Sequence, residues 1–183
     1  MLKLHESIKE ATKASHQALE GTVVRALKAI RSEADYAGIL KKFYAYFQAV
    51  EQAIAPHITP DVLPDYAERR NSRYLRADIE ALGGDLAQLP HAEAPQVNNS
   101  LEAMSALYVL EGSIMGGAYI VKMLASYGLT KGTSFFCGYG EESGSMWAIF
   151  TDALNRVGAD PSTHQHAAAV ANETFCRFGK VFA

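Results

Sequence analysis

The feature that most constrains the fold is a hydrophobic periodicity close to that of an α-helix, which runs through nearly the whole chain. No segment shows the strict alternation of apolar and polar residues that is typical of a half-buried β-strand. No internal repeat or long linker divides the sequence, and 183 residues are enough for one sizeable core. We therefore expect an all-α, single-domain helical bundle over residues 1–183.

Local signals predict where the helices begin and end. A first helix, starting near the N-terminus, is expected to break near Gly21. A second helix follows Ser32 and stops at Pro56, because proline cannot continue a helix. A shorter helix is closed by Gly83 and Gly84, which are typical residues after a helix end.

A long helix is expected in the second half of the chain. Asn99 is its N-cap, and Glu102 follows three residues later, as in a capping box. The apolar pattern predicts that this helix continues to Gly128. The remaining expected elements are, in chain order, a mobile loop over 132–144, a helix over 146–157, and a last helix started by Asp160 and Pro161.

Composition and charge exclude several classes of protein. The net charge is −3 and there is no basic run, which argues against nucleic-acid binding. The N-terminus mixes charged and apolar residues and is not a secretory signal. The apolar stretch 103–124 carries Glu111 and Lys122, so we expect a buried helix rather than a membrane span. Cys137 and Cys176 form no CxxC pattern, which favours free thiols in a reducing cytoplasm.

The long helix has two uncharged faces, only one of which a bundle core requires. On a helical projection, Glu111 and Lys122 lie on the opposite, outer side. The first face is a continuous apolar stripe, formed by Ala103, Leu107, Leu110, Ile114, Gly117, Val121 and Leu124. The second face is made of small or apolar residues, namely Ser105, Val109, Gly112, Ser113, Gly116 and Ile120.

Three glycines in the middle of this helix require an explanation. Gly112, Gly116 and Gly117 each cost about 1 kcal/mol relative to alanine in a helix interior. Either another helix packs closely on a GxxxG face, or a flat ligand lies against bare backbone. Spacing alone favours neither explanation.

His16 is the second candidate for a site. It lies at the edge of the apolar face of the first helix, with Lys9, Lys13 and Glu20 on the outer side. One ring nitrogen is available to bind a metal while Glu20, at i+4, accepts a hydrogen bond from the other. The alternative is an ordinary histidine at the boundary of the core. No HExxH or ExxH pattern occurs, which argues against a zinc protease and a di-iron carboxylate bundle.

The segments around His16 and the glycines together resemble a known family. IKEATKASHQALEG is similar to the proximal helix of heme oxygenases, and LYVLEGSIMGG to their glycine-rich distal helix in its bacterial form. RYLRADIEALGG and ANETFCRF also resemble bacterial members, so the likeness covers nearly the whole chain. The resemblance implies the heme oxygenase-like fold and cleavage of heme to biliverdin, CO and ferrous iron. It also implies O2 as co-substrate and electrons from an external reductase or ferredoxin.

The resemblance assigns a role to individual residues. His16 is the expected iron ligand, while Gly112, Ser113 and Gly116 are expected at the catalytic, distal face of the heme. The remaining expected contacts with the heme or its ligand are Lys9, Lys13, Glu20, Gly117 and Phe175. Animal-type members have an aspartate where this chain has Ser113, which leaves open how protons are delivered. The segment MWAIFTDALNRV also lacks the lysine and arginine expected near its start.

Three alternative functions remain at this point. A heme-binding or heme-sensing protein without turnover would use the same histidine. A branch of the same fold handles thiamin-like pyrimidines with a cysteine and paired carboxylates, but Cys176 has only Glu173 nearby and Cys137 lies in the expected loop. The third alternative is a purely structural bundle.

Overall fold

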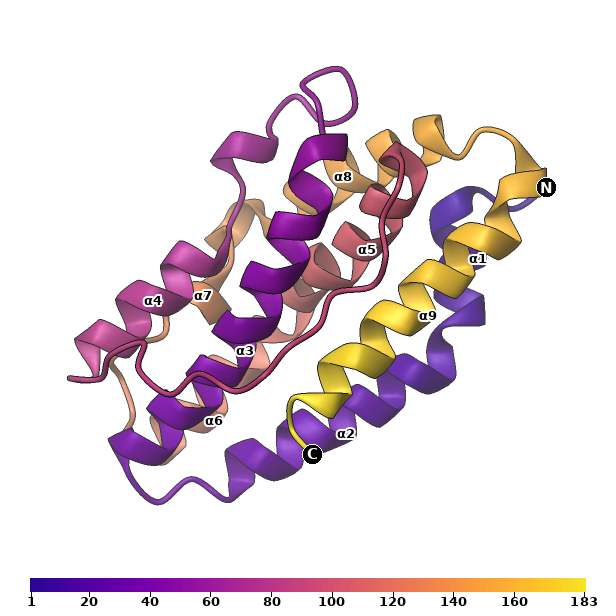
Figure 1. The fold of residues 1–183 in the computed structure, drawn as a ribbon. Coiled ribbons are helices and arrows are strands. Elements are labelled where there is room, and N and C mark those ends of the chain that lie inside the picture. The colour runs from indigo at the N-terminus through magenta and orange to yellow at the C-terminus, as the bar shows by residue number, and fades with distance from the viewer.

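The computed structural model describes residues 1–183 as a bundle of helices without a strand (Figure 1). The all-α fold class is therefore confirmed. The α-helices are α1 (Leu4–Ala11), α2 (Lys13–Lys28), α3 (Glu33–Ile54), α4 (Ser72–Ala81), α5 (Ser100–Gly112), α6 (Gly117–Ser126), α7 (Ser134–Cys137), α8 (Ser143–Val157) and α9 (His164–Lys180). The 3-10 helices are η1 (Ala55–His57), η2 (Tyr66–Glu68), η3 (Ser113–Gly116), η4 (Gly140–Glu142) and η5 (Pro161–Thr163).

The last helix, α9, organises the bundle. It packs against α1 and α2 on one side and against α5 on another, so residues from both ends of the chain lie side by side (Figure 1). Helix α3 packs against α4 and α5. An aromatic cluster joins α3, α7 and α9, with ring centroids 5.1 Å apart for Phe43 and Phe178 and 5.0 Å apart for Phe47 and Phe135. These buried rings form the centre of the core.

The first helix breaks at a different residue from the one expected. The interruption lies at Thr12, between α1 and α2, while Gly21 lies inside α2. The Thr12 side chain is buried, and its hydroxyl donates to the carbonyl of Ile8 at 2.7 Å. Such a bond from a threonine to the preceding turn competes with the helical pattern and bends the helix. Gly21 does not end the helix, because glycine is tolerated within one at a modest cost.

The expected helix ends are largely confirmed. Ser32 caps α3, and η1 follows α3 at Pro56. Gly83 has a φ of +77°, as expected for a glycine after a helix end. The Asn99 side chain accepts a hydrogen bond from the Glu102 amide at 2.9 Å, but Glu102 itself accepts from Asn98 rather than Asn99. The Glu102 half of the capping box therefore closes on Asn98, one residue before the N-cap.

The segment 132–144 is more ordered than the expected loop. It contains α7, whose Phe135 and Phe136 are buried in the core. The Asp78 carboxylate accepts hydrogen bonds from the amides of Ser134 and Phe135 at 3.0 and 2.8 Å. The glycines thus form tight turns around a short helix that is fixed to α4.

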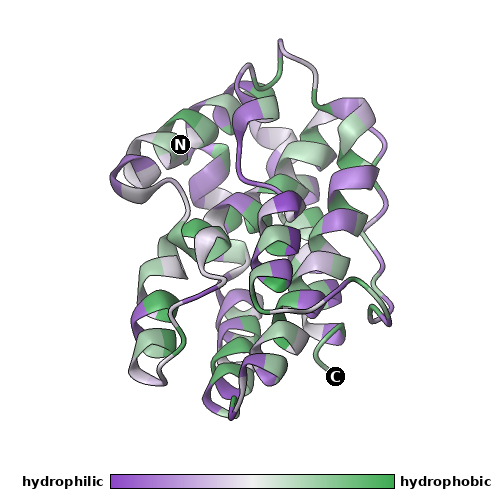
Figure 2. Cartoon of the chain, turned by 90° about the vertical axis from the view of Figure 1, so that its left-hand side faces the viewer, coloured by the Kyte–Doolittle hydropathy of each residue, from purple (hydrophilic) through white to green (hydrophobic).

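The long apolar segment does not form one continuous α-helix to Gly128. It changes from α5 to the 3-10 helix η3 and back to α6, so the bend suggested by its glycines is present. Ser100–Ser126 is long and apolar enough to cross a membrane, but half of its most apolar window is buried inside the bundle, as in a core helix. Most helices carry both hydrophobic and hydrophilic residues (Figure 2), as expected for helices that bury one face in a bundle.

Candidate functional site

The His16 imidazole stacks on an aromatic ring from the other end of the chain. His16 is exposed on α2, whereas Phe175 on α9 is only 6% exposed. The two ring centroids are 5.2 Å apart and the ring planes differ by 19°. Because Phe175 is held in the core, it limits how the imidazole can turn.

The charged residues expected around His16 do not contact it. Lys9, Lys13 and Glu20 are exposed and form no ion pair, and Glu20 makes no hydrogen bond to the imidazole. Both ring nitrogens of His16 are therefore without a protein partner. An exposed, unpartnered imidazole that is oriented by a neighbouring ring is suited to bind a ligand or a metal.

The side chains around His16 favour a metal whose other ligands belong to a cofactor. No group of three or more His, Cys, Asp or Glu side chains is placed to hold a metal ion. A single histidine is too few for a structural or catalytic zinc site. One axial histidine is, however, sufficient for a heme iron, whose other ligands come from the porphyrin. The side chains around His16 therefore fit a heme better than a free ion.

The three glycines of the distal segment have different environments. A Cβ built on Gly116 meets nothing within 4 Å, and one on Gly112 meets only the ring of Trp147, at 3.5 Å. A Cβ on Gly117 would overlap the carbonyl oxygen of Phe136. Close packing on α7 thus explains Gly117. It does not explain Gly116, whose φ of −92° is open to any residue.

The open side of Gly116 carries exposed apolar side chains. Met115 is 60% exposed and Tyr119 is 61% exposed, although most large apolar residues of the chain are buried. Trp147 lies next to Gly112 and packs on Tyr108, with ring centroids 5.4 Å apart. Bare backbone flanked by exposed apolar side chains is a suitable surface for a flat, largely apolar ligand.

Ser113 is held by a buried arginine, Arg70, which no sequence motif indicated. Its hydroxyl donates to the Leu110 carbonyl at 2.6 Å and accepts a hydrogen bond from Arg70 Nη2 at 2.7 Å. Arg70 also donates to the carbonyls of Leu110 and Phe135, at 3.1 and 2.9 Å. Its guanidinium lies over the Phe135 ring, 3.9 Å from the centroid. Burial lowers the pKa of Arg70 to about 10, despite the nearby Glu111.

A second buried arginine lies beside the first. Arg69 pairs with Glu111 at 2.8 Å and donates two hydrogen bonds to Asp65, both at 2.9 Å. Burial lowers the pKa of Arg69, but the hydrogen bonds to Asp65 and the charge of Glu111 outweigh it and leave the pKa above its usual value. The Tyr139 hydroxyl donates to Glu111 and accepts from the Arg70 amide, at 3.1 and 2.9 Å. Glu111, expected on an outer face, is therefore buried in this network.

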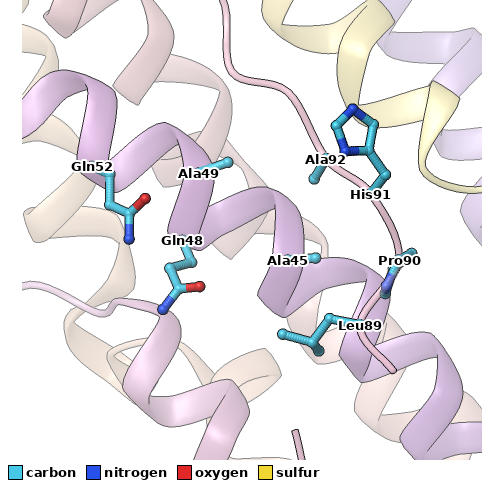
Figure 3. A pocket seen from close by; sticks show the side chains of 8 residues that line it. All are labelled: Ala45, Gln48, Ala49, Gln52, Leu89, Pro90, His91 and Ala92. Atoms are coloured by element: carbon cyan, nitrogen blue, oxygen red, sulfur yellow. The ribbon is translucent and has the colours of Figure 1, made fainter. Parts of the chain in front are cut away.

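Two cavities lie away from His16 and from the glycines Gly112, Gly116 and Gly117. One, of about 470 Å³, lies between α3 and the segment 89–92, where Gln48, Gln52 and His91 contribute the polar groups (Figure 3). The other, of about 410 Å³, lies beside Arg69 and Arg70. Neither of these two cavities includes His16 or a distal glycine.

Comparisons with known proteins identify the family and the fold of the chain. A family model for heme oxygenase matches residues 2–183. The heme oxygenase of Neisseria meningitidis, solved with NO and CO bound, is 20% identical with a TM-score of 0.85, over 100% of this chain and 91% of its own. The Leptospira interrogans heme oxygenase is 20% identical with a TM-score of 0.77, over 99% and 98%. Synechocystis heme oxygenase-1, solved with heme, is 19% identical with a TM-score of 0.74, over 99% and 91%.

At these identities the structural neighbours show the fold, which is of the heme oxygenase-like type. No curated protein sequence matches the chain. The family model matches nearly every residue, including both helices that carry the candidate site. The chain therefore belongs to the heme oxygenase family.

Proposed function

We propose that this protein is a cytoplasmic heme oxygenase that binds heme through His16. It would cleave heme to biliverdin, CO and ferrous iron, using O2 and electrons from an external reductase or ferredoxin. The observation that carries the proposal is the exposed His16 imidazole, which has no protein partner and stacks on Phe175. Membership of the family supports the same assignment.

Each candidate residue has a simple task in this function. His16 binds the iron, and Phe175 fixes the plane of its ring. Gly116, beside which a side chain would meet open space, would leave room for a bound heme, and Gly112 would place bare backbone next to Trp147. The exposed Lys9 and Lys13 would pair with the negatively charged heme propionates. The bound heme supplies the O2 chemistry, so the chain needs no nucleophile of its own.

Proton delivery does not depend on a free Ser113 hydroxyl. That hydroxyl already donates its proton to Leu110 and accepts a hydrogen bond from Arg70. A serine also cannot hold a negative charge at neutral pH, unlike the aspartate of animal-type members. Ordered water is therefore the expected proton carrier, with Ser113 and Arg70 holding the backbone that positions it.

Hemin binding followed by turnover tests the proposal. Wild-type protein is titrated with hemin, and the visible spectrum is compared with that of His16→Ala. The proposal requires a histidine-ligated complex at about one heme per chain, and loss of that ligand in the variant. The complex is then supplied with a reductase or ascorbate in air, with catalase present, while biliverdin absorbance and CO are measured. Binding without these products would favour the heme-binding or heme-sensing alternative.

A further inference from the structure

Helix α9 contacts α2 through a second residue besides Phe175. Asn172 lies three positions before Phe175, which puts both side chains on the same face of α9. Asn172 Oδ1 accepts a hydrogen bond from Ser15 Oγ at 2.8 Å, and Asn172 Nδ2 donates to the Ala11 carbonyl at 3.2 Å. A single amide therefore joins α9 to both sides of the helix break at Thr12.

This break makes the first turn of α2 depend on tertiary contacts. At a helix end, backbone groups lack their usual partners along the chain. The Ala11 carbonyl, at the end of α1, accepts the Asn172 amide. Ser15 is the neighbour of His16, whose own amide donates to the Thr12 carbonyl at 2.9 Å. The position of His16 is thus set by one turn of helix that Asn172 holds from outside.

Resting on the proposed function, we propose that Asn172 is a positioning residue for the axial ligand His16. Asn172 fixes the height and rotation of the first turn of α2, and Phe175 fixes the plane of the imidazole ring. Neither residue need touch the heme. The geometry of the iron–histidine bond is then determined largely by α9, from the far end of the chain.

A structural role in helix packing alone would explain the same two hydrogen bonds, so a matched control is needed. Asn155 on α8 provides it, because its Oδ1 accepts a hydrogen bond from the His5 amide of α1 at 3.1 Å. Asn155→Ala removes a comparable amide contact between α1 and the rest of the bundle, but away from His16. Asn172→Asp keeps an acceptor for Ser15 and loses the donor to Ala11.

Two measurements are made on wild type, Asn172→Ala, Asn172→Asp and Asn155→Ala. Hydrogen–deuterium exchange of the heme-free protein reports the protection of the amides of residues 13–16. Resonance Raman of the heme complex, reduced to the ferrous state, reports the iron–histidine stretching frequency. We expect Asn172→Ala to increase exchange of the His16 amide about three- to tenfold, which corresponds to the net contribution of about one hydrogen bond. The stretching frequency should shift in the same variant, with a smaller shift in Asn172→Asp.

The outcomes separate this inference from the proposed function. Asn155→Ala should match wild type in both measurements, and equal effects of the two alanine variants would overturn the positioning role. Unchanged exchange and frequency in Asn172→Ala would overturn it as well. If His16→Ala retains the wild-type hemin spectrum, the ligand assignment itself is wrong, whatever the exchange data show.

Discussion

Arg70 Nη2 lies 2.7 Å from Ser113 Oγ, so the residue at the expected catalytic position is tied to a buried cation. The same guanidinium bonds the Leu110 carbonyl at the end of α5 and the Phe135 carbonyl of α7. These bonds satisfy backbone groups at the point where the α-helix changes to η3. Arg70 thereby fixes the shape of the segment 110–117.

Replacing Arg70 tests this role directly. Arg70→Leu removes three buried hydrogen bonds, to the Leu110 and Phe135 carbonyls and to the Ser113 hydroxyl, and we expect a loss of about 3 kcal/mol in the free energy of unfolding, measured with urea. The matched control is Arg73→Leu, because Arg73 is exposed on α4 and should change stability by less than about 0.5 kcal/mol. Equal effects of the two variants would show that the buried contacts of Arg70 contribute nothing.

Ser113→Ala should have a smaller effect. The variant loses one acceptor for Arg70, which retains two carbonyl partners, so we expect about 1 kcal/mol of destabilisation. Biliverdin formation should fall only modestly, because the hydroxyl is already engaged within the protein. A loss of about a hundredfold or more would instead identify Ser113 as an acid–base group. Initial rates of biliverdin formation at equal heme loading distinguish the two results.

The adjacent glycines Gly116 and Gly117 should respond in opposite ways. Gly117→Ala places a methyl group on the Phe136 carbonyl, and we expect about 3 kcal/mol of destabilisation. Gly116→Leu meets open space and should leave the unfolding temperature equal or higher, because leucine is the better helix former. Its side chain should nevertheless greatly weaken hemin binding, measured by titration. If Gly116→Leu binds hemin like wild type, the heme does not lie on this face.

A fourth prediction concerns acid stability. The hydrogen bond from His166, at 2.7 Å, lowers the pKa of Glu102 below its ordinary value of 4.5. A carboxyl with a lowered pKa in the folded state binds protons more readily when the chain is unfolded. Its contribution to the free energy of unfolding is therefore fully present above about pH 4.5. It is lost as the pH falls through the lower, folded pKa. The difference in Tm between wild type and Glu102→Gln should therefore shrink on acidification from pH 6 towards pH 3. A difference independent of pH would exclude this contribution.

The sequence predicted those features that a local pattern encodes. Helix caps such as Ser32 and Asn99 use residues within one turn, so they could be recognised. His16 and the distal glycines were found because each lies in a contiguous motif. The break at Thr12 was missed, because a threonine that bonds to the preceding turn is a weaker sequence signal than the nearby Gly21.

Contacts between distant residues could not be predicted in the same way. Arg70 and Ser113 are 43 positions apart, and Ser15 and Asn172 are 157 positions apart. The hydrophobic periodicity of a helix does not indicate which polar residue from a distant part of the chain it contacts. Glu111 was therefore placed on an outer face, although Arg69 makes its burial possible by pairing with it.

The unequal surroundings of the two adjacent glycines have an evolutionary consequence. A chance substitution at Gly116 would leave a folded protein, so a descendant could lose ligand binding in a single step and retain the fold. At Gly117, any larger residue would require α7 to move at the same time, since the Phe136 backbone occupies the space. Among relatives that have changed function, Gly117 should therefore persist where Gly116 has been replaced.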